Sequence, residues 1–229
     1  MLRLLVGAVA ASLVAGAAIL GAATLLRPGA TAAGAPHFVE EAAAAGVDHR
    51  YDGEFEFFVG GGVAVFDCDG DGRQDLYFAG GSEPAALFRN ESAVGGALRF
   101  DRVVGASTDL ERVTGAYPLD IDGDRETDLA VLRFGENVLL RGLGDCRFER
   151  GNESLGYDGG DDWTAAFSAT WEGEAALPTL AFGNYLELDD GGEWTGACAP
   201  NELIRPAAEG PAYARPMHLE PSWCTLSML

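Results

Sequence analysis

The sequence predicts an all-β protein made of four-stranded antiparallel sheets. Short apolar runs are separated by turns rich in glycine, and 32 of the 229 residues are glycine. Apolar runs bounded by Gly and Asn are typical of strands. In addition, a block of about 50 residues occurs twice and leaves traces of a third copy.

The first 35 residues, 1–35, form a segment of their own. Arg3 is followed by 23 uncharged residues, which is long enough to span a bilayer as a helix. The small residues "ATAAGA" offer a cleavage site after Ala32. Met1 and Arg3 favour a cytoplasmic N-terminus, although Arg27 weakens that bias. We therefore expect an apolar N-terminal helix that serves as signal peptide or membrane anchor, and a secreted, periplasmic or membrane-anchored remainder.

The remainder, 36–229, consists of repeats. "GGGVAVFDCDGDGRQDLYFAGG" has a second copy, "GAYPLDIDGDRETDLAVLRFG", and "ALFRNES" is matched by "VLLRGLG". The aspartates of the two copies align with a constant offset of 53 residues. We expect two intact units, at about 54–106 and 107–157. In each, one strand enters the acidic loop (63–66 and 116–119), a second leaves it (76–79 and 129–132), and two more follow.

A third unit, about 158–224, is degenerate. "WTAAFSATWEGEAALPTLAFGNYL" keeps the strand–loop–strand pattern, but Ser168, Thr170 and Glu172 replace the carboxylates. "NELIRPAAEG" and "YARPMHLEPSW" are its expected outer strands, and "TLSML" resembles the start of a further unit. Before the first unit, "HFVEEAAAAGVDHRY" resembles the end of a unit, as in "RFERGNESLGYD".

Units of four antiparallel strands and about 50 residues are typical of β-propeller blades. A single blade cannot bury both of its faces, so neighbouring blades must stack. Propellers typically have 4 to 8 blades, and residues 36–229 provide fewer than four. We therefore expect an incomplete propeller, with an open or assembled array of blades as the alternative.

Each acidic loop has the composition of a calcium site, with carboxylates at positions 1, 3, 5 and 9. Ca²⁺ takes 6 to 8 oxygens in flexible geometry, including backbone carbonyls such as that of position 7. The expected ligands are Asp67, Asp69, Asp71, Arg73 and Asp75 in the first loop, and Asp120, Asp122, Asp124, Glu126 and Asp128 in the second. Mg²⁺ usually keeps several waters, and zinc would need nearby His or paired Cys, so Ca²⁺ is the expected cofactor.

The EF-hand shares the alternating start of these loops, but it requires Glu at position 12. That position holds Phe78 in the first loop and Val131 in the second, and strands rather than helices flank both loops. The second loop has Arg125 where the first has Gly72. If this position requires a positive φ, a non-glycine residue there costs about 1 kcal/mol, and we expect the second site to be weaker.

The two acidic units resemble FG-GAP, or VCBS, repeats, the calcium-loop blades of integrin α-subunit propellers. "FVEEAAAAGVDHRY" and "ALFRN" are similar, more narrowly, to the cartilage-acidic-protein type with the ASPIC/UnbV group. The resemblance covers roughly residues 37–229. It implies a seven-bladed, secreted or surface-attached propeller that holds Ca²⁺ in its loops and functions in adhesion or binding.

The formal net charge of −21 argues against nucleic acid as a partner, because phosphate binding needs clustered cations. It also argues against adsorption to an anionic membrane, so membrane contact is expected only through the N-terminal segment. His37, His49 and His218 lie in no recognisable catalytic motif. We expect a non-catalytic module for an extracellular protein or glycan ligand. The alternative is the propeller domain of a larger secreted enzyme, for example one acting on polysaccharide.

Four cysteines in an exported chain suggest disulfides. Cys198 and Cys224 bracket the outer part of the third unit, and we expect this pair to be bonded. Cys68 occupies position 2 of the first acidic loop, and Cys146 lies in the outer hairpin of the next unit. Whether these two pair stays open from the sequence alone.

Overall fold

The computed structural model describes residues 37–189, 191 and 193–228. The chain divides into two units, 1–40 and 41–229, and of the first only residues 37–40 are described, without helix or strand. The expected apolar N-terminal helix therefore lies outside the described residues. Within those residues, no helix has the length and hydropathy needed to cross a membrane.

The first acidic unit folds into a four-stranded antiparallel sheet of order β1-β2-β3-β4. Its strands are β1 (Val63–Phe66), β2 (Asp75–Phe78), β3 (Ala86–Asn90) and β4 (Phe100–Val103). Strand β1 has the bounds that the sequence predicts. The register pairs Phe66 with Asp75, so the acidic loop is the turn of the β1–β2 hairpin.

The second unit repeats this sheet with the order β5-β6-β7-β8. Its strands are β5 (Val113–Leu119), β6 (Asp128–Arg133), β7 (Val138–Gly142) and β8 (Phe148–Arg150). Leu119 pairs with Asp128, which places the second acidic loop at the same point of its hairpin.

The third unit forms a sheet of order β14-β13-β10-β9. Its strands are β9 (Thr164–Thr170), β10 (Thr179–Asn184), β13 (Asn201–Ile204) and β14 (Met217–Leu219). The last two lie in the expected outer-strand segments. A separate hairpin of β11 (Leu186–Leu188) and β12 (Trp194–Cys198), which the repeat did not predict, is inserted between β10 and β13. Residues 225–228 form no strand, and the further unit stays a prediction.

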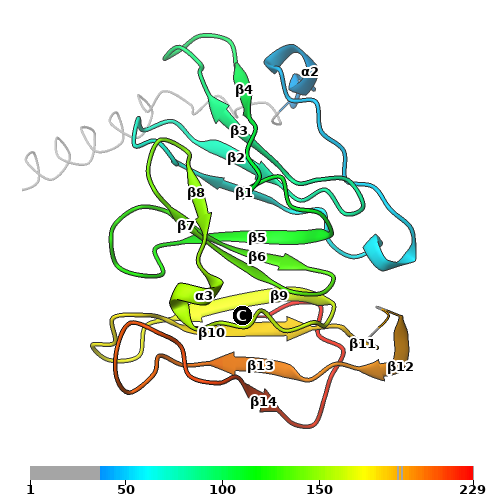
Figure 1. The fold of residues 1–229 in the computed structure, drawn as a ribbon. Helices are drawn as coiled ribbons and strands as arrows, with labels where there is room; N and C mark the ends of the chain where they lie inside the picture. The colour runs from blue at the N-terminus through cyan, green and yellow to red at the C-terminus, as the bar shows by residue number, and fades with distance from the viewer. Residues whose placement is uncertain (1–36, 190, 192, 229) are drawn as a thin grey trace, which may run out of the picture. The chain divides into compact units, whose positions relative to one another are not determined.

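The three sheets are stacked face to face in chain order, and the described residues form no closed ring (Figure 1). Because neighbouring residues of a strand point to opposite faces, the middle sheet must be apolar on both. Leu129 and Val131 of β6 pack in the cluster shared with the first sheet, whereas Ala130 and Leu132 pack in the cluster shared with the third. The all-β class and the antiparallel four-stranded sheets expected for propeller blades are thus confirmed.

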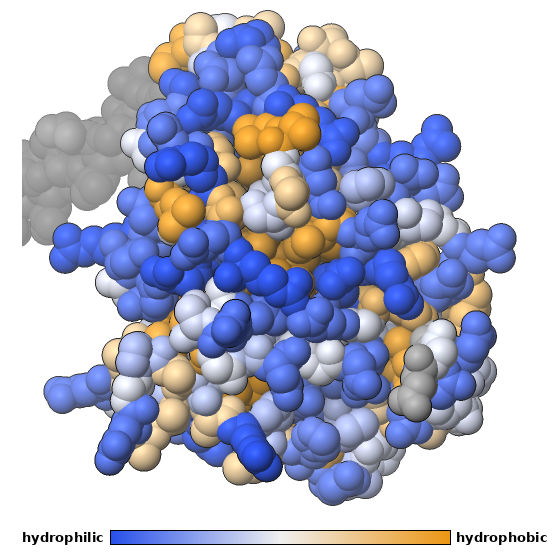
Figure 2. Space-filling model, viewed as in Figure 1, coloured by the Kyte–Doolittle hydropathy of each residue, from blue (hydrophilic) through white to orange (hydrophobic). Residues whose placement is uncertain are grey.

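The outer face of the first sheet is only partly covered. In β1, Ala64 and Phe66 are buried against the second sheet, but Val63 and Val65 on the other face are 46% and 49% exposed. Hydrophilic side chains predominate on the face shown in Figure 2, with smaller apolar patches between them. A one-sided burial pattern of this kind is what the end of a blade stack produces.

Two short helices have matching ends, although they pack in different places. Helix α2 (Ala42–Ala45) precedes the first sheet and packs on it, whereas α3 (Asn152–Leu155) follows the second and packs between the second and third. Each ends at a glycine in the left-handed conformation, Gly46 with φ 86° and Gly156 with φ 68°. A 3₁₀ turn, η1 (Phe55–Phe57), lies between α2 and β1. The similarity that the sequence shows between these two segments is therefore structural as well.

Two disulfides link the described residues. Cys198 is bonded to Cys224, the pair expected from the sequence, and Cys68 is bonded to Cys146. The first bond closes a local segment of the third sheet, since its cysteines are 26 positions apart in sequence. The second joins the first acidic loop to the turn between β7 and β8 of the neighbouring sheet.

Replacing Cys198 and Cys224 together with alanine should lower the free energy of unfolding by roughly 3 kcal/mol, because the unfolded chain gains the freedom that the cross-link removes. Denaturant titration of the two proteins measures the free energy of unfolding from midpoint and slope together, since removing a cross-link from the unfolded chain changes the slope as well. A variant with the wild-type free energy of unfolding would show that this cross-link does not stabilise the fold.

Candidate metal centre

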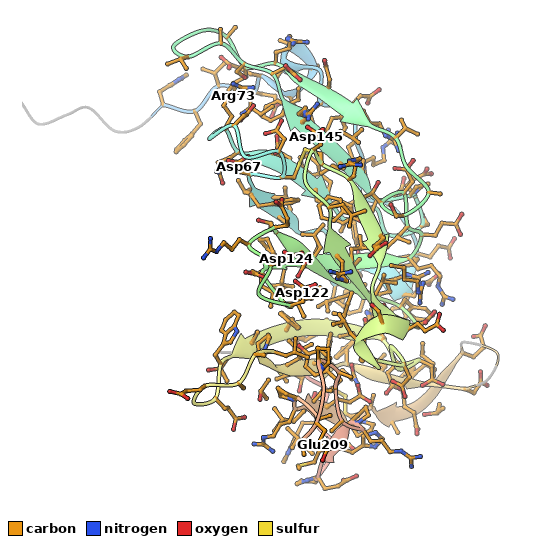
Figure 3. The ribbon with its side chains drawn as sticks, turned by 60° about the vertical axis from the view of Figure 1, so that its left-hand side comes forward. Asp67, Arg73, Asp122, Asp124, Asp145 and Glu209 are labelled. Carbon is orange, nitrogen blue, oxygen red and sulfur yellow. A yellow bond between two sulfur atoms is a disulfide. The ribbon has the colours of Figure 1, made fainter. Side chains whose placement is uncertain are left out.

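The two acidic loops lie on the same edge of neighbouring sheets. Figure 3 shows Asp67 of the first loop and Asp122 and Asp124 of the second on this edge. Each loop connects the first strand of its sheet, which lies at one edge, to the second strand, β1 to β2 and β5 to β6. The repeat in the sequence therefore becomes a repeat in space.

The first loop is wound around its own carboxylates. Asp67 accepts hydrogen bonds from the amides of Gly70 and Gly72, both at 2.8 Å, through its two oxygens. Asp71 accepts from the amide of Arg73 at 2.8 Å. Burial raises the pKa of Asp67, but four backbone hydrogen bonds outweigh it and hold that pKa below its usual range. The loop thus favours the charged form of its first carboxylate.

The second loop repeats these contacts at every matching position. Asp120 accepts from the amides of Gly123 at 2.7 Å and Arg125 at 3.1 Å, and Asp124 accepts from the amide of Glu126 at 2.9 Å. Two loops with different sequences between their aspartates therefore adopt one conformation. Solvated turns that share only composition would not be expected to coincide in this way.

The carboxylate at position 9 lies at the end of each loop, where the second strand begins. Asp75 and Asp128 are the first residues of β2 and β6, and neither has exposed surface. Their donors are the amides of Cys68 and Asn90 for Asp75 (2.8 and 2.7 Å), and of Ile121 and Gly142 for Asp128 (both 2.7 Å). Burial nevertheless raises the pKa of Asp128 to about 6 and raises that of Asp75. Both charges therefore lack full compensation within the protein.

An arginine from the third strand pairs with position 3 of each loop. Arg89 Nε lies 2.8 Å from an oxygen of Asp69, and Arg141 Nη2 lies 2.6 Å from an oxygen of Asp122. In the antiparallel register Leu76 pairs with Phe88, so the next residue of β3, Arg89, lies beside the position-9 aspartate of the first loop. Leu129 pairs with Leu140 in the same way, which places Arg141 beside the position-9 aspartate of the second loop. The sequence carries this signal as the arginine shared by "ALFRN" and "VLLRG", and the sequence reasoning missed it.

The third unit shows what remains of the loop when the carboxylate cluster is absent. Arg205, directly after β13, pairs with Glu172 at 3.0 Å, and Thr179 donates to the same carboxylate at 2.8 Å. Thr179 takes the place of Asp75 as first residue of the second strand. Here one arginine pairs with one acid, while Glu174 of the same loop adds a second carboxylate. The arginine–acid pair is therefore shared by all three sheets, whereas the cluster of four aspartates is confined to the first two.

The carboxylates lie close enough to share one ion. In the first loop, oxygens of Asp67, Asp69 and Asp71 lie within 4.8 Å of one another, and in the second those of Asp120, Asp122 and Asp128 do. Oxygens that ligate Ca²⁺ at 2.3–2.6 Å can be up to about 5 Å apart, so the donor set fits this ion. Asp75 groups instead with Cys68 and Cys146, and Asp124 belongs to no such group. The roles of the carbonyls of Arg73 and Glu126 stay predictions.

The backbone at position 6 has a positive φ in both loops. Gly72 adopts φ 83° and Arg125 adopts φ 76°. The left-handed conformation is free of strain for glycine but costs an L-residue about 1 kcal/mol. Position 6 therefore does require a positive φ, which is the condition under which we predicted a weaker second site.

The third sheet contains a further buried acid, away from the loops. Glu202 in β13 is 7% exposed, and burial raises its pKa to about 7. His218 Nε2 lies 3.4 Å from its carboxylate and acts in the opposite direction, whereas Asp158, Asp162 and Asp161 raise the pKa further.

A family model described as an FG-GAP-like repeat matches residues 67–131. The match begins at the first aspartate of the first loop and ends within β6, so it spans both acidic loops. No curated protein matches the chain. Together with the antiparallel four-stranded sheets, the match fits a protein of the FG-GAP, propeller type.

The buried acid predicts how stability depends on pH. Because the folded protein keeps the proton of Glu202 at pH values where the unfolded chain has lost it, this contribution is complete below about pH 4 and is lost as pH rises through about 7. Between pH 5 and pH 8, calcium-free wild type should lose about 1–3 kcal/mol more stability than Glu202→Gln. Glu209→Gln, at a labelled site in Figure 3, is the control. Parallel profiles for all three proteins would contradict the assignment.

Proposed function

We propose that this protein is an exported, non-catalytic binding or adhesion module of the propeller type, whose two acidic loops each hold Ca²⁺. We further propose that its blades belong to a seven-bladed propeller of the cartilage-acidic-protein type, because α2 and α3 mark equivalent unit ends, as that resemblance implies.

The excess of negative charge in two structurally identical loops carries the calcium proposal. Four carboxylates of the first loop face two guanidinium groups, those of Arg73 and Arg89, which leaves a charge of −2 for an ion to balance. The corresponding loop of the third unit has only two acids, Glu172 and Glu174, beside Arg205, so it lacks the cluster and has a smaller excess. When bound, Ca²⁺ would supply this charge and draw the loop's carboxylates together; the side chains and amides of the loop hold the donor set in place.

Export is supported by the disulfides, because such bonds persist in oxidising compartments and are rare in the cytosol. The uncharged run of the N-terminal segment adds a route for export. Extracellular calcium is millimolar, and extracellular modules often bind with constants of roughly 10⁻⁴ to 10⁻³ M, so the proposed sites would be occupied there.

The ligand is proposed to be an extracellular protein or glycan, bound at a cavity on the edge opposite to the acidic loops. The cavity holds about 480 Å³, and its walls include Phe55, Glu56, Arg112, Phe134, Trp163, Leu188 and Trp194. Arg112 precedes β5 and Phe134 follows β6, whereas the acidic loop joins these strands at their other ends. Exposed aromatic rings beside charged groups suit a ligand with an apolar face and a polar rim.

Substituting Trp194 tests this placement. Trp194 is 53% exposed at the cavity, so Trp194→Ala should weaken binding to glycans captured on an array by about tenfold, the range of one lost aromatic anchor. Trp223→Ala, which removes an exposed ring outside the cavity walls, is the control. Equal binding by all three proteins would place any ligand elsewhere.

Calorimetric titration tests the metal sites. Wild type should bind two calcium ions, while Asp69→Ala and Asp122→Ala should each bind one. The loss in Asp69→Ala should cost more, because Gly72 suits its turn and Arg125 does not. At a hundredfold excess over Kd, each ion should add about 2.7 kcal/mol to the free energy of unfolding.

Asp101→Ala serves as the control for these titrations, since Asp101 is an exposed acid in β4 that pairs with Arg99. It should keep both sites. The metal proposal is wrong if wild type binds no calcium at millimolar concentration, or if the loop variants bind as wild type does.

A further inference from the structure

We propose that the turn between β7 and β8 positions the carboxylates of the first acidic loop, and that the Cys68–Cys146 disulfide thereby sets the calcium affinity of this loop alone. This inference rests on the proposed calcium function and names a device that distinguishes its two sites. The disulfide is the only one of the two described that touches an acidic loop.

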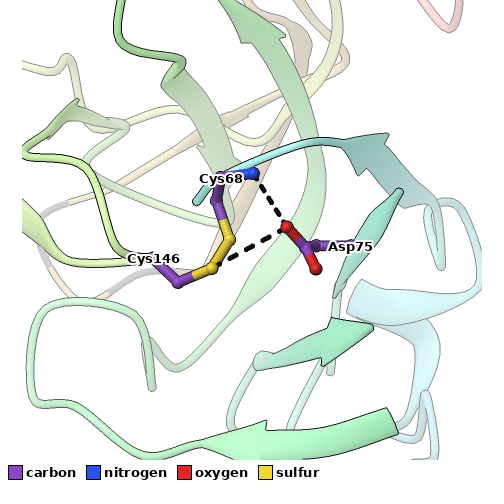
Figure 4. Close-up of side chains that lie close together, drawn as sticks. All are labelled: Cys68, Asp75 and Cys146. Carbon is purple, nitrogen blue, oxygen red and sulfur yellow. Dashed lines mark hydrogen bonds between the residues drawn. A yellow bond between two sulfur atoms is a disulfide. The ribbon is translucent and has the colours of Figure 1, made fainter. Parts of the chain in front are cut away.

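The disulfide lies directly against the buried carboxylate that closes the loop (Figure 4). The amide of Cys68 donates to Asp75 Oδ2 at 2.8 Å, and Cys146 Sγ lies 3.7 Å from the same oxygen. A sulfur in a disulfide has no proton to donate, so the second distance is a packing contact. The amide of Cys146 in turn donates to the carbonyl of Cys68 at 2.9 Å. Cys68 is therefore fixed through both its side chain and its backbone.

The same turn reaches the loop by a second route. Asp145, the neighbour of Cys146, lies 3.3 Å from Arg89 Nη2, while Arg89 Nε lies 2.8 Å from Asp69. The turn thus contacts the position-9 carboxylate through sulfur and the position-3 carboxylate through an arginine. Two predicted ligands of one ion are held by one element of the neighbouring sheet.

The backbone of this turn has a defined left-handed geometry. Asp145 and Cys146 adopt φ 57° and φ 55°, in the left-handed region that L-residues rarely occupy. They are the central residues of the hairpin turn that the amide of Arg147 closes on the carbonyl of Gly144 at 3.1 Å, and tight hairpin turns favour a positive φ at both positions. The covalent bond to Cys68 adds a second constraint on this turn.

The second loop is a matched comparison within the same chain. Ile121 takes the place of Cys68, and its amide donates to Asp128 at 2.7 Å in the same way. Its side chain is fully buried in the apolar cluster between the second and third sheets. The second loop therefore has the same hydrogen bond without a covalent tie. Removing the disulfide should loosen the first loop and leave the second unchanged.

The test measures each site by itself. In an Asp122→Ala background, where only the first site remains, Cys68→Ala with Cys146→Ala should weaken calcium binding on the order of tenfold, the lower end for lost support around metal ligands. In an Asp69→Ala background the same pair of substitutions should leave the second site unchanged within twofold.

Cys198→Ala with Cys224→Ala is the matched control and should change neither site. Should the alanine pair not fold, Cys68→Val with Cys146→Ala restores a branched apolar residue at position 2, as in the second loop.

A metal-free measurement separates this inference from the calcium proposal. Amide hydrogen exchange without calcium should be at least tenfold faster at residue 68 in the disulfide variant and unchanged at Ile121. Unaltered protection at residue 68, unaltered affinity at the first site, or equal losses at both sites would overturn the inference. If wild type binds no calcium, the calcium function and the effect on affinity fail together, and the exchange result alone decides whether the disulfide positions the loop.

Discussion

A carboxylate buried without exposed surface lies at the base of each acidic loop, and much of the surrounding structure compensates for it. Removing a charge from water is costly unless hydrogen bonds and opposite charge replace the solvent. Asp75 and Asp128 each accept two backbone amides, one from the loop and one from the third strand, and thereby tie the hairpin to the rest of its sheet. Burial raises both pKa values in spite of these amides. We propose that a cation in the loop supplies the remaining compensation.

The stacking of the sheets gives these loops a fixed frame. The middle sheet buries alternate residues of β6 against both neighbours, so its apolar surface is covered only when both are present. The first loop gains a direct bond to the neighbouring sheet through Cys68 and Cys146. The conformation of the loops is thus coupled to the packing of the sheets. An ion that binds the loops is therefore expected to stabilise the stacked sheets as a whole.

The sequence was sufficient to predict what repeats and insufficient for what does not. The hairpins around the acidic loops follow from two aligned copies, and β1 lies at its predicted bounds. The β11–β12 hairpin has no counterpart in the other units, so no repeat predicts it. The pairing of Cys68 with Cys146 depends on how neighbouring sheets are stacked, a distance that sequence spacing does not contain. The arginines Arg89, Arg141 and Arg205 do repeat, and an alignment of the third strands would have found them.

The central claim is that each acidic loop is built around a calcium ion, and crystals grown in millimolar calcium test it most directly. We expect anomalous scattering from two ions, each with ligand oxygens at about 2.3–2.6 Å, one among Asp67, Asp69, Asp71 and Asp75 and the other among Asp120, Asp122, Asp124 and Asp128. Loops that contain no ion under these conditions, with Arg89 and Arg141 as the only cations on Asp69 and Asp122, would contradict it.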